Sequence, residues 1–153
     1  MSYTGSQAQS GNGVIFAINT GTAQSPTYTT IAEVLDFSQT GKQNKTADVT
    51  NLQSSAEEFI ATITSPGKYD LTFNRVSGDA GQAAVKASFD AKTVVMYQIT
   101  LPKTGAQTST GDSYKFTALV EEFDDVSGVS PTKQIQSKSS LKVTGPITLT
   151  VGS

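Results

Sequence analysis

The chain has 153 residues, which suits one domain with a hydrophobic core and is too short for two domains of ordinary size. Its formal net charge is −2, and one arginine stands against ten lysines, so no strong basic field is present to hold nucleic acid. The absence of cysteine and histidine excludes disulfides and thiolate zinc sites, and it removes the commonest general base.

Residues 1–13 open the chain and are polar and rich in glycine, so we expect a flexible N-terminal arm. They contain neither a basic start nor an apolar stretch, and no later apolar run approaches the roughly 20 residues of a membrane helix. We therefore expect a soluble protein that is synthesised in a cytoplasm. Thirteen glycines and five prolines, with abundant serine and threonine, favour an all-β domain with many turns.

Alternation of apolar and polar side chains predicts the strands, because a β-strand has a side-chain period of two. The clearest example places Tyr69, Leu71 and Phe73 on one face, and we expect these side chains to lie in the core. The expected strands are, in chain order, 14–18, 28–37, 57–64, 68–76, 93–101, 113–123 and 141–151.

Within these strands, further apolar positions share a face. Val95, Tyr97 and Ile99 form a second core stripe, and Phe59, Ala61 and Ile63 share one face of the strand over 57–64. In the strand over 28–37, the residues Ile31, Glu33, Leu35 and Phe37 are expected to point to the same side.

One short helix is predicted over 82–89. Asp79 has the spacing of a capping box with Gln82, and the alanine-rich segment that follows gives about three turns ending near Asp90. The helix is expected to pack on one face of a sandwich or half-closed barrel.

Two polar segments interrupt the strands. Residues 38–55 contain only Ala47, Val49 and Leu52 as apolar residues, and they are too many for an ordinary hairpin turn. Loops of this length are usually functional or disordered. A second loop is expected over 124–140, before the final strand.

The final strand, 141–151, has two contrasting faces and a Gly145-Pro146 pair at its centre. Proline has no N–H to donate to a ladder, so the strand must lie at a sheet edge or bend at a bulge there. An uncovered edge strand is a template for another chain, which indicates assembly rather than chemistry. The apolar face carries Leu141, Val143, Ile147, Leu149 and Val151, and the polar face carries Lys142, Thr144, Thr148 and Thr150.

The densest charge cluster consists of Glu121, Glu122, Asp124 and Asp125. Three readings are open: a solvated strand end, an acidic ring made by several copies of the subunit, and a metal or catalytic site. Consecutive strand residues face opposite sides, so only alternate members converge. Because the serine–lysine and phosphate-loop motifs also fail on order and spacing, we expect no catalytic, cofactor-binding or metal-binding residue.

Taken in order, several segments resemble the tail tube (major tail) proteins of long-tailed bacteriophages, and the resemblance covers nearly the whole chain. It is most specific at the C-terminal end, where a small polar segment precedes a strand that begins L-K-V-T-G. The segments are IAEVLDF at 31–37, EEFI at 57–60, the helix at 82–89, YKFTALVEEF at 114–123, SPTK at 130–133 and SSLKVTGPITLT at 139–150.

The resemblance implies a single domain over 1–153, mainly β. It would be a β-sandwich or half-barrel of seven to eight strands with one short α-helix, which completes a ring β-barrel on oligomerisation. It also implies a structural virion protein without enzymatic activity or cofactor, made in the host bacterial cytoplasm. Hexameric rings would stack into a hollow tail tube that delivers DNA without sequence-specific binding. The implied partners are further copies of the chain, a tape-measure protein, a tail terminator and distal tail or baseplate proteins.

Two sets of site residues follow. The loop at 38–55 is expected to reach the adjacent ring, as are the terminal arms. Two alternatives to the phage tail tube function are open. One is an inner tube protein of a contractile injection system or a gene-transfer particle. The other is a carbohydrate-binding β-sandwich, although the chain lacks tryptophan for an aromatic platform. The inter-ring residues are Thr40, Lys42, Asn44, Lys45, Asp48 and Asn51, and the lumen-facing candidates are Glu121, Glu122, Asp124, Lys142, Thr144, Thr148 and Thr150.

Overall fold

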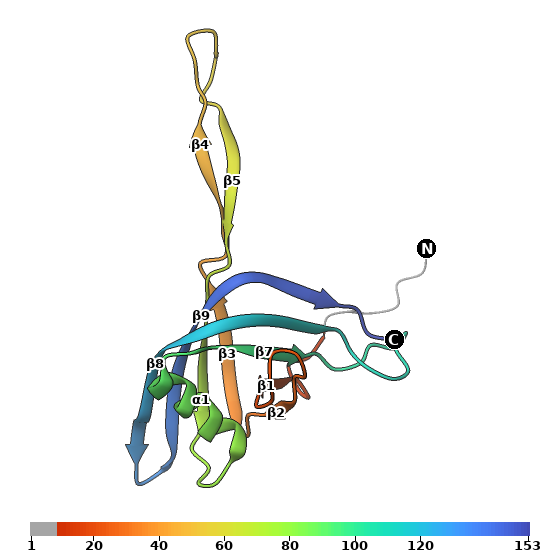
Figure 1. Ribbon diagram of the computed structural model, residues 1–153, viewed down its shortest axis with the longest axis vertical. Helices are drawn as coiled ribbons and strands as arrows, with labels where there is room; N and C mark the ends of the chain where they lie inside the picture. Colours follow the sequence, from red (N-terminus) through yellow and green to blue (C-terminus); the bar gives the residue numbers. More distant parts are fainter. Residues whose placement is uncertain (1–8) are drawn as a thin grey trace.

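The computed structural model describes residues 9–153, so the expected arm over 1–13 lies largely outside the described residues. Within 9–153 the chain forms nine strands and one helix (Figure 1). None of these elements is a helix with the length and apolarity that a membrane span requires. The elements are β1 (Ile15–Asn19), β2 (Tyr28–Thr30), β3 (Val34–Thr40), β4 (Gln43–Asp48), β5 (Phe59–Ser65), β6 (Lys68–Asn74), α1 (Ala80–Ala91), β7 (Val94–Thr100), β8 (Ser113–Ser130) and β9 (Lys133–Thr150).

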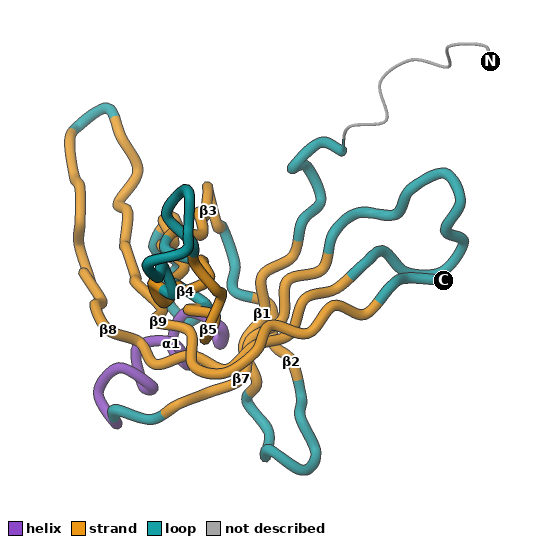
Figure 2. Tube along the Cα trace, turned by 90° about the horizontal axis from the view of Figure 1, so that it is seen from above, coloured by secondary structure: helices purple, strands orange, loops and turns teal. Residues whose placement is uncertain are grey.

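Seven strands form one antiparallel sheet in the order β2-β1-β7-β8-β9-β6-β3, and β4 and β5 form a separate two-stranded ribbon. The strands β8 and β9 are eighteen residues long and run through both halves of the sheet. They bend between the halves (Figures 1 and 2), where β-bulges interrupt their ladder at Lys115/Thr117 and Val120/Glu122. The bend turns one sheet into a half-barrel, so the predicted mainly β class is confirmed.

The core lies between the two halves of the bent sheet. The Phe16 ring of β1 contacts Phe37 of β3 at a centroid distance of 5.2 Å and Tyr69 of β6 at 6.2 Å. The expected core stripes on β6 and β7 are confirmed, because Tyr69, Leu71, Phe73, Tyr97 and Ile99 are buried, while Val95 is half-buried.

The predicted helix and its cap are also confirmed. The side chain of Asp79 accepts a hydrogen bond from the backbone N–H of Gln82 at 2.9 Å, which satisfies one of the free N–H groups at the helix start. Gln82 is itself buried, and its side-chain amide donates to the carbonyls of Ala32 and Asn74. Val85 adds its side chain to the hydrophobic core, so α1 covers the core face of the sheet.

The prediction that the final strand lies at a sheet edge is wrong for most of its length. The strand β9 lies between β8 and β6, and it begins eight residues earlier than predicted. Its first part, up to Lys142, pairs with β6. Beyond Val143 it pairs with β8 alone among the described residues, and Pro146 lies there at an irregularity in the ladder. The bend predicted from the Gly-Pro pair is therefore confirmed.

The loop predicted over 124–140 is also wrong, because β8 and β9 continue through it and turn at Pro131-Thr132. The polar sequence has a structural reason. The buried hydroxyls of Ser137 and Ser139 donate to the carbonyls of Asp125 and Glu122, at 2.7 and 3.2 Å. Both carbonyls lie at bulges, where the regular ladder is interrupted, so small polar residues replace apolar ones.

The strand predicted over 28–37 is divided into β2 and β3. Glu33 adopts a left-handed backbone conformation, with φ of 58°, between the two strands. This turn changes which side chains share a face: Ile31 is buried, whereas Leu35 is half exposed. The predicted common face of Ile31, Glu33, Leu35 and Phe37 is therefore wrong.

Candidate functional site

One face of β3, β6, β9 and β8 is polar, and we call it the four-strand polar face. Directly paired residues point to the same side of a sheet, so the register defines its rows. One row runs through Ser38, Asp70, Ser140 and Glu122. The whole face contains Asp36, Ser38 and Thr40 of β3, Lys68, Asp70 and Thr72 of β6, Lys138, Ser140 and Lys142 of β9, and Leu119, Glu122 and Asp124 of β8.

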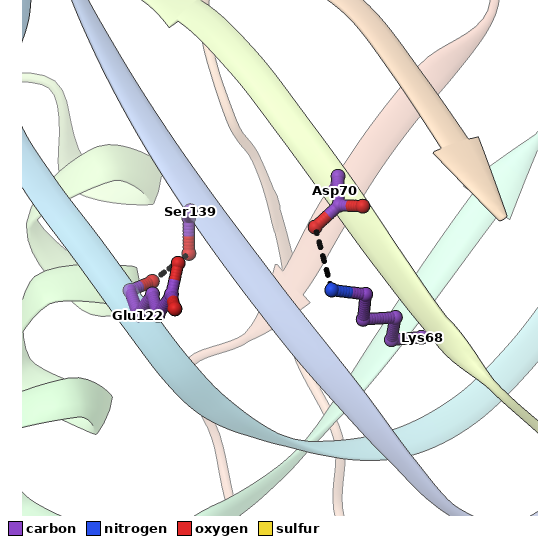
Figure 3. Close-up of polar contacts among 4 residues, drawn as sticks. All are labelled: Lys68, Asp70, Glu122 and Ser139. Atoms are coloured by element: carbon purple, nitrogen blue, oxygen red, sulfur yellow. Dashed lines mark hydrogen bonds and ion pairs between the residues drawn. The ribbon is translucent and has the colours of Figure 1, made fainter. Parts of the chain in front are cut away.

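Charges of both signs are interspersed on this face, with four carboxylates and three ammonium groups. The Lys68 Nζ and Asp70 Oδ1 atoms lie 3.9 Å apart (Figure 3). Both side chains are exposed, so their interaction is weak. The face includes a shallow hollow of about 300 Å³. Among residues 9–153, no three acidic side chains gather to hold a metal ion. Because four carboxylates stand against three ammonium groups, the face is slightly acidic.

The structure brings some of the predicted lumen residues together. Glu122, Asp124 and Lys142 lie on the four-strand polar face, and Thr144 follows next to Lys142 on the same side of β9. The hydroxyl of Thr117 donates to the Thr144 carbonyl at 2.6 Å, which ties β8 and β9 together at the bend.

Three other candidates lie elsewhere. Thr148 and Thr150 are paired with Lys115 and Ser113, in the half of the sheet that bends away. Glu121 is the extra residue of the bulge after Val120, and it lines a hollow with residues at the end of α1. Glu121 therefore does not share the face of Glu122.

Sequence reasoning missed eight of the twelve residues of the four-strand polar face, and it assigned a ninth, Thr40, to the inter-ring set. The alternation that placed Tyr69, Leu71 and Phe73 in the core also requires the residues between them to point the other way. That signal was sufficient to find the β6 row. Ser38, Lys138 and Ser140 lie in the segments 38–55 and 124–140, whose polar sequences predict loops. The missed residues are Asp36, Ser38, Lys68, Asp70, Thr72, Leu119, Lys138 and Ser140.

The four strands end in two open edges among the described residues. The strand β3 pairs with β6 alone. The strand β8 pairs with β7 only up to Leu119, so its remaining residues have β9 as their single neighbour. Such edges present unpaired N–H and C=O groups that another strand can bind.

The ribbon of β4 and β5, with its tip at 49–58, projects from the body along the longest axis of the molecule (Figure 1), and we call it the arm. The predicted loop at 38–55 is therefore wrong as secondary structure, because it contains the end of β3 and all of β4. No core packs on this ribbon to impose an apolar alternation. The strand predicted over 57–64 is present as β5, and its apolar residues Phe59, Ala61 and Ile63 are exposed.

Local hydrogen bonds order the arm tip. The Thr50 amide donates to the Asp48 carboxylate at 2.9 Å, and hydrogen bonds from Thr50 lower the pKa of this carboxyl. The Glu58 amide donates to the Thr50 hydroxyl at 2.8 Å. The predicted inter-ring residues map onto the arm and its base: Thr40 ends β3, Lys42 lies in the link to β4, Asn44, Lys45 and Asp48 lie in β4, and Asn51 lies in the tip.

A two-stranded ribbon is marginally stable alone, and this one exposes large apolar side chains, including Leu52, Phe59 and Ile60. Together with the open edges and the polar face, it defines the class of protein as a β-structured assembly subunit.

Comparison with known proteins identifies the kind of assembly. Residues 10–149 match the family described as phage tail tube protein, TTP. The chain therefore belongs to the phage tail tube protein family. No curated protein matches its sequence.

Solved structures share the fold over almost the whole chain. A chain from the tail of an empty gene transfer agent particle, determined with C6 symmetry, has a TM-score of 0.72 and 18% identity. The match covers 94% of this chain and 100% of that chain. The SPP1 tail tube has a TM-score of 0.73 and 13% identity, covering 95% of this chain and 80% of that one. The anti-feeding prophage cap has a TM-score of 0.72 and 9% identity, covering 99% and 97%.

Proposed function

We propose that copies of this tail tube protein join side by side into rings, and that the rings stack into a hollow tube without any catalytic role. The observation that carries the proposal is the direction of the two edge strands. Neighbours in the order β3-β6-β9-β8 are antiparallel, so β3 and β8 run in opposite directions. Rotation about a ring axis keeps strand directions along that axis, so β8 of one copy and β3 of the next would pair antiparallel.

The four-strand polar face would line the lumen. The opposite face is covered by α1 and by the half of the sheet that contains β7, β1 and β2, so it is not available to solvent. With six subunits, as in the C6 tail of the gene transfer agent, the barrel would have about 24 strands. At about 4.8 Å per strand and a tilt near 40°, its backbone diameter would be about 40–50 Å.

A lumen of this kind suits the passage of DNA. Proteins that hold DNA neutralise its phosphates with lysine and arginine. Here the acidic groups Asp36, Asp70, Glu122 and Asp124 outnumber the lysines of the face. DNA would therefore pass without being held, and a tape-measure protein would occupy the same space before ejection.

The arm would connect successive rings. It continues the direction of β3 and β6, away from the body (Figure 1). From Gln43 to Leu52 it could extend about 30 Å at 3.3 Å per residue, which exceeds the length of β6. The segment 38–55 would thus contact the adjacent ring. A tail terminator and baseplate proteins would bind the tube ends, and the subunit would be made in the cytoplasm of the bacterial host.

Electron microscopy of the purified protein tests this function. We expect rings and tubes about 80–90 Å across, from the barrel diameter plus two further layers at about 10 Å spacing on each side. A strictly monomeric protein that never polymerises, even with tail partners, would overturn the proposal.

A truncation tests the arm separately. Replacing 44–64 with Asn-Gly removes both ribbon strands while keeping the Gln43–Ser65 pair at the base. We expect an unchanged urea unfolding transition, rings by mass measurement, and no tubes. Normal tubes from this variant would show that the arm does not connect rings.

A further inference from the structure

The end of the β8–β9 hairpin has exposed apolar side chains that the four-strand polar face does not include. Val126, Val129 and Ile135 are 58%, 61% and 45% exposed. We call 126–136 the hairpin end. In Figure 1 it lies at the bottom of the molecule, at the opposite end of the longest axis from the arm.

The arm tip carries a second exposed apolar surface. Leu52 is fully exposed at the tip, and Val49, Phe59 and Ile60 flank it. Exposed apolar patches of this kind mark interaction surfaces. Stacking by translation along an axis needs two different surfaces at opposite ends of the subunit, because the contact is head-to-tail. The arm tip and the hairpin end meet that requirement.

The extreme ends of the arm and of the hairpin differ in charge. Residues 48–58 carry Asp48, Glu57 and Glu58 and no basic residue, whereas 126–136 carry Lys133 and no acidic residue. Opposite charges favour the contact between an arm tip and a hairpin end, and like charges disfavour contact between two arm tips.

We propose that the arm tip of a subunit in one ring docks on the hairpin end of a subunit in the next ring, with Leu52 packed against Val126, Val129 and Ile135. This inference rests on the ring stacking proposed above and names the two surfaces that make it. Each subunit gives one arm and receives one, so the contacts form continuous lines along the tube.

Cysteine cross-linking tests the contact, because the chain has no cysteine of its own. Tubes of the double variant Leu52→Cys with Val129→Cys are oxidised and separated without reductant. We expect a ladder that continues well beyond six subunits, since the links run from ring to ring without closing. The matched control is Leu52→Cys with Val94→Cys, a valine on the body that is 54% exposed against 61% for Val129, and it should give no ladder.

The outcomes separate this inference from the proposed function. Tubes that form but give no Leu52–Val129 links overturn the inference and leave the tube intact. A ladder that stops at six subunits also overturns it, because the contact would then lie within one ring. Failure of the wild-type protein to form rings would instead contradict the proposed function.

A charge exchange provides a second measurement. Glu57→Lys with Glu58→Lys should reduce the tube length distribution at least several-fold while rings persist, and Lys133→Glu should do the same. Combining the three changes should restore tubes if the two surfaces face one another. If the triple variant forms tubes no longer than those of the variants altered on one surface, the proposed docking is contradicted.

Discussion

Exchanging one residue of the final strand tests the two-faced arrangement of β9 most sharply. Val143 is 5% exposed and lies opposite Ala118 in the core, whereas its neighbour Lys142 is exposed on the four-strand polar face. Val143→Asp removes about 1.5–2 kcal/mol of apolar burial and adds several kcal/mol for a carboxylate without a partner. The sum, about 4–6 kcal/mol, is comparable with the whole stability of a small domain.

The matched control is Lys142→Asp on the same strand. Lys142 lies directly opposite Lys68 on β6, and like charges opposite one another are unfavourable. The exchange should therefore change the free energy of unfolding by no more than about 0.5 kcal/mol, and in the stabilising direction. Urea unfolding followed by circular dichroism measures both variants. Equal effects at the two positions would show that the assignment of faces on β9 is wrong.

The pH dependence of the stability lost in Val143→Asp provides a further test, because burial determines its direction. Burial raises the pKa of an introduced carboxyl at position 143 in the folded state above its value in the unfolded chain. The unfolded chain then releases the proton first, so the deficit relative to wild type grows as pH rises from 4 to 8. A deficit that shrinks with rising pH would contradict the burial of this position.

Three further perturbations test other parts of the structure. Gly67→Ala should cost at least about 2 kcal/mol, because Gly67 has φ of 79° and an added Cβ would meet the Thr40 carbonyl oxygen; an unchanged urea midpoint would refute this. Asp79→Ala should cost about 1–2 kcal/mol through loss of the helix cap, with Asp79→Asn retaining most of it; equal costs for both would show that the cap does not act by accepting a hydrogen bond. Glu122→Lys with Asp124→Lys should give tubes that retain DNA with a steep salt dependence, measured by co-sedimentation. Equal retention by wild-type tubes would contradict the lumen assignment.

The parts of the fold that could be predicted are those where one face is buried and the other is wet. The β6 stripe of Tyr69, Leu71 and Phe73 has this character, and its strand begins where the sequence indicates. The helix cap at Asp79 could be predicted for a different reason, because it is a local interaction with Gln82, three residues along the chain. An apolar residue at every second position in a strand, or at every third to fourth in a helix, arises only where one face of that element packs on a core.

The parts that could not be predicted lack that selection. The arm exposes both of its faces, so β4 has no apolar alternation to distinguish it from a loop. Around Ser137 and Ser139 the core accepts hydroxyls because bulges leave carbonyls to be satisfied, and the segment reads as polar. The position of β9 inside the sheet depends on its pairing with β6, which is distant in sequence. For the candidate lumen, Glu122, Asp124 and Lys142 were predicted, whereas the β3 and β6 positions were not.

Electron cryo-microscopy of tubes assembled from the wild-type protein would show directly which strands line the lumen and which strands pair between subunits. We expect a continuous antiparallel barrel in which β8 of each subunit pairs with β3 of the next, with Asp70 and Lys142 facing inward. A tube lined by α1 or by β1 and β2, or a ring whose sheets remain separate, would contradict it.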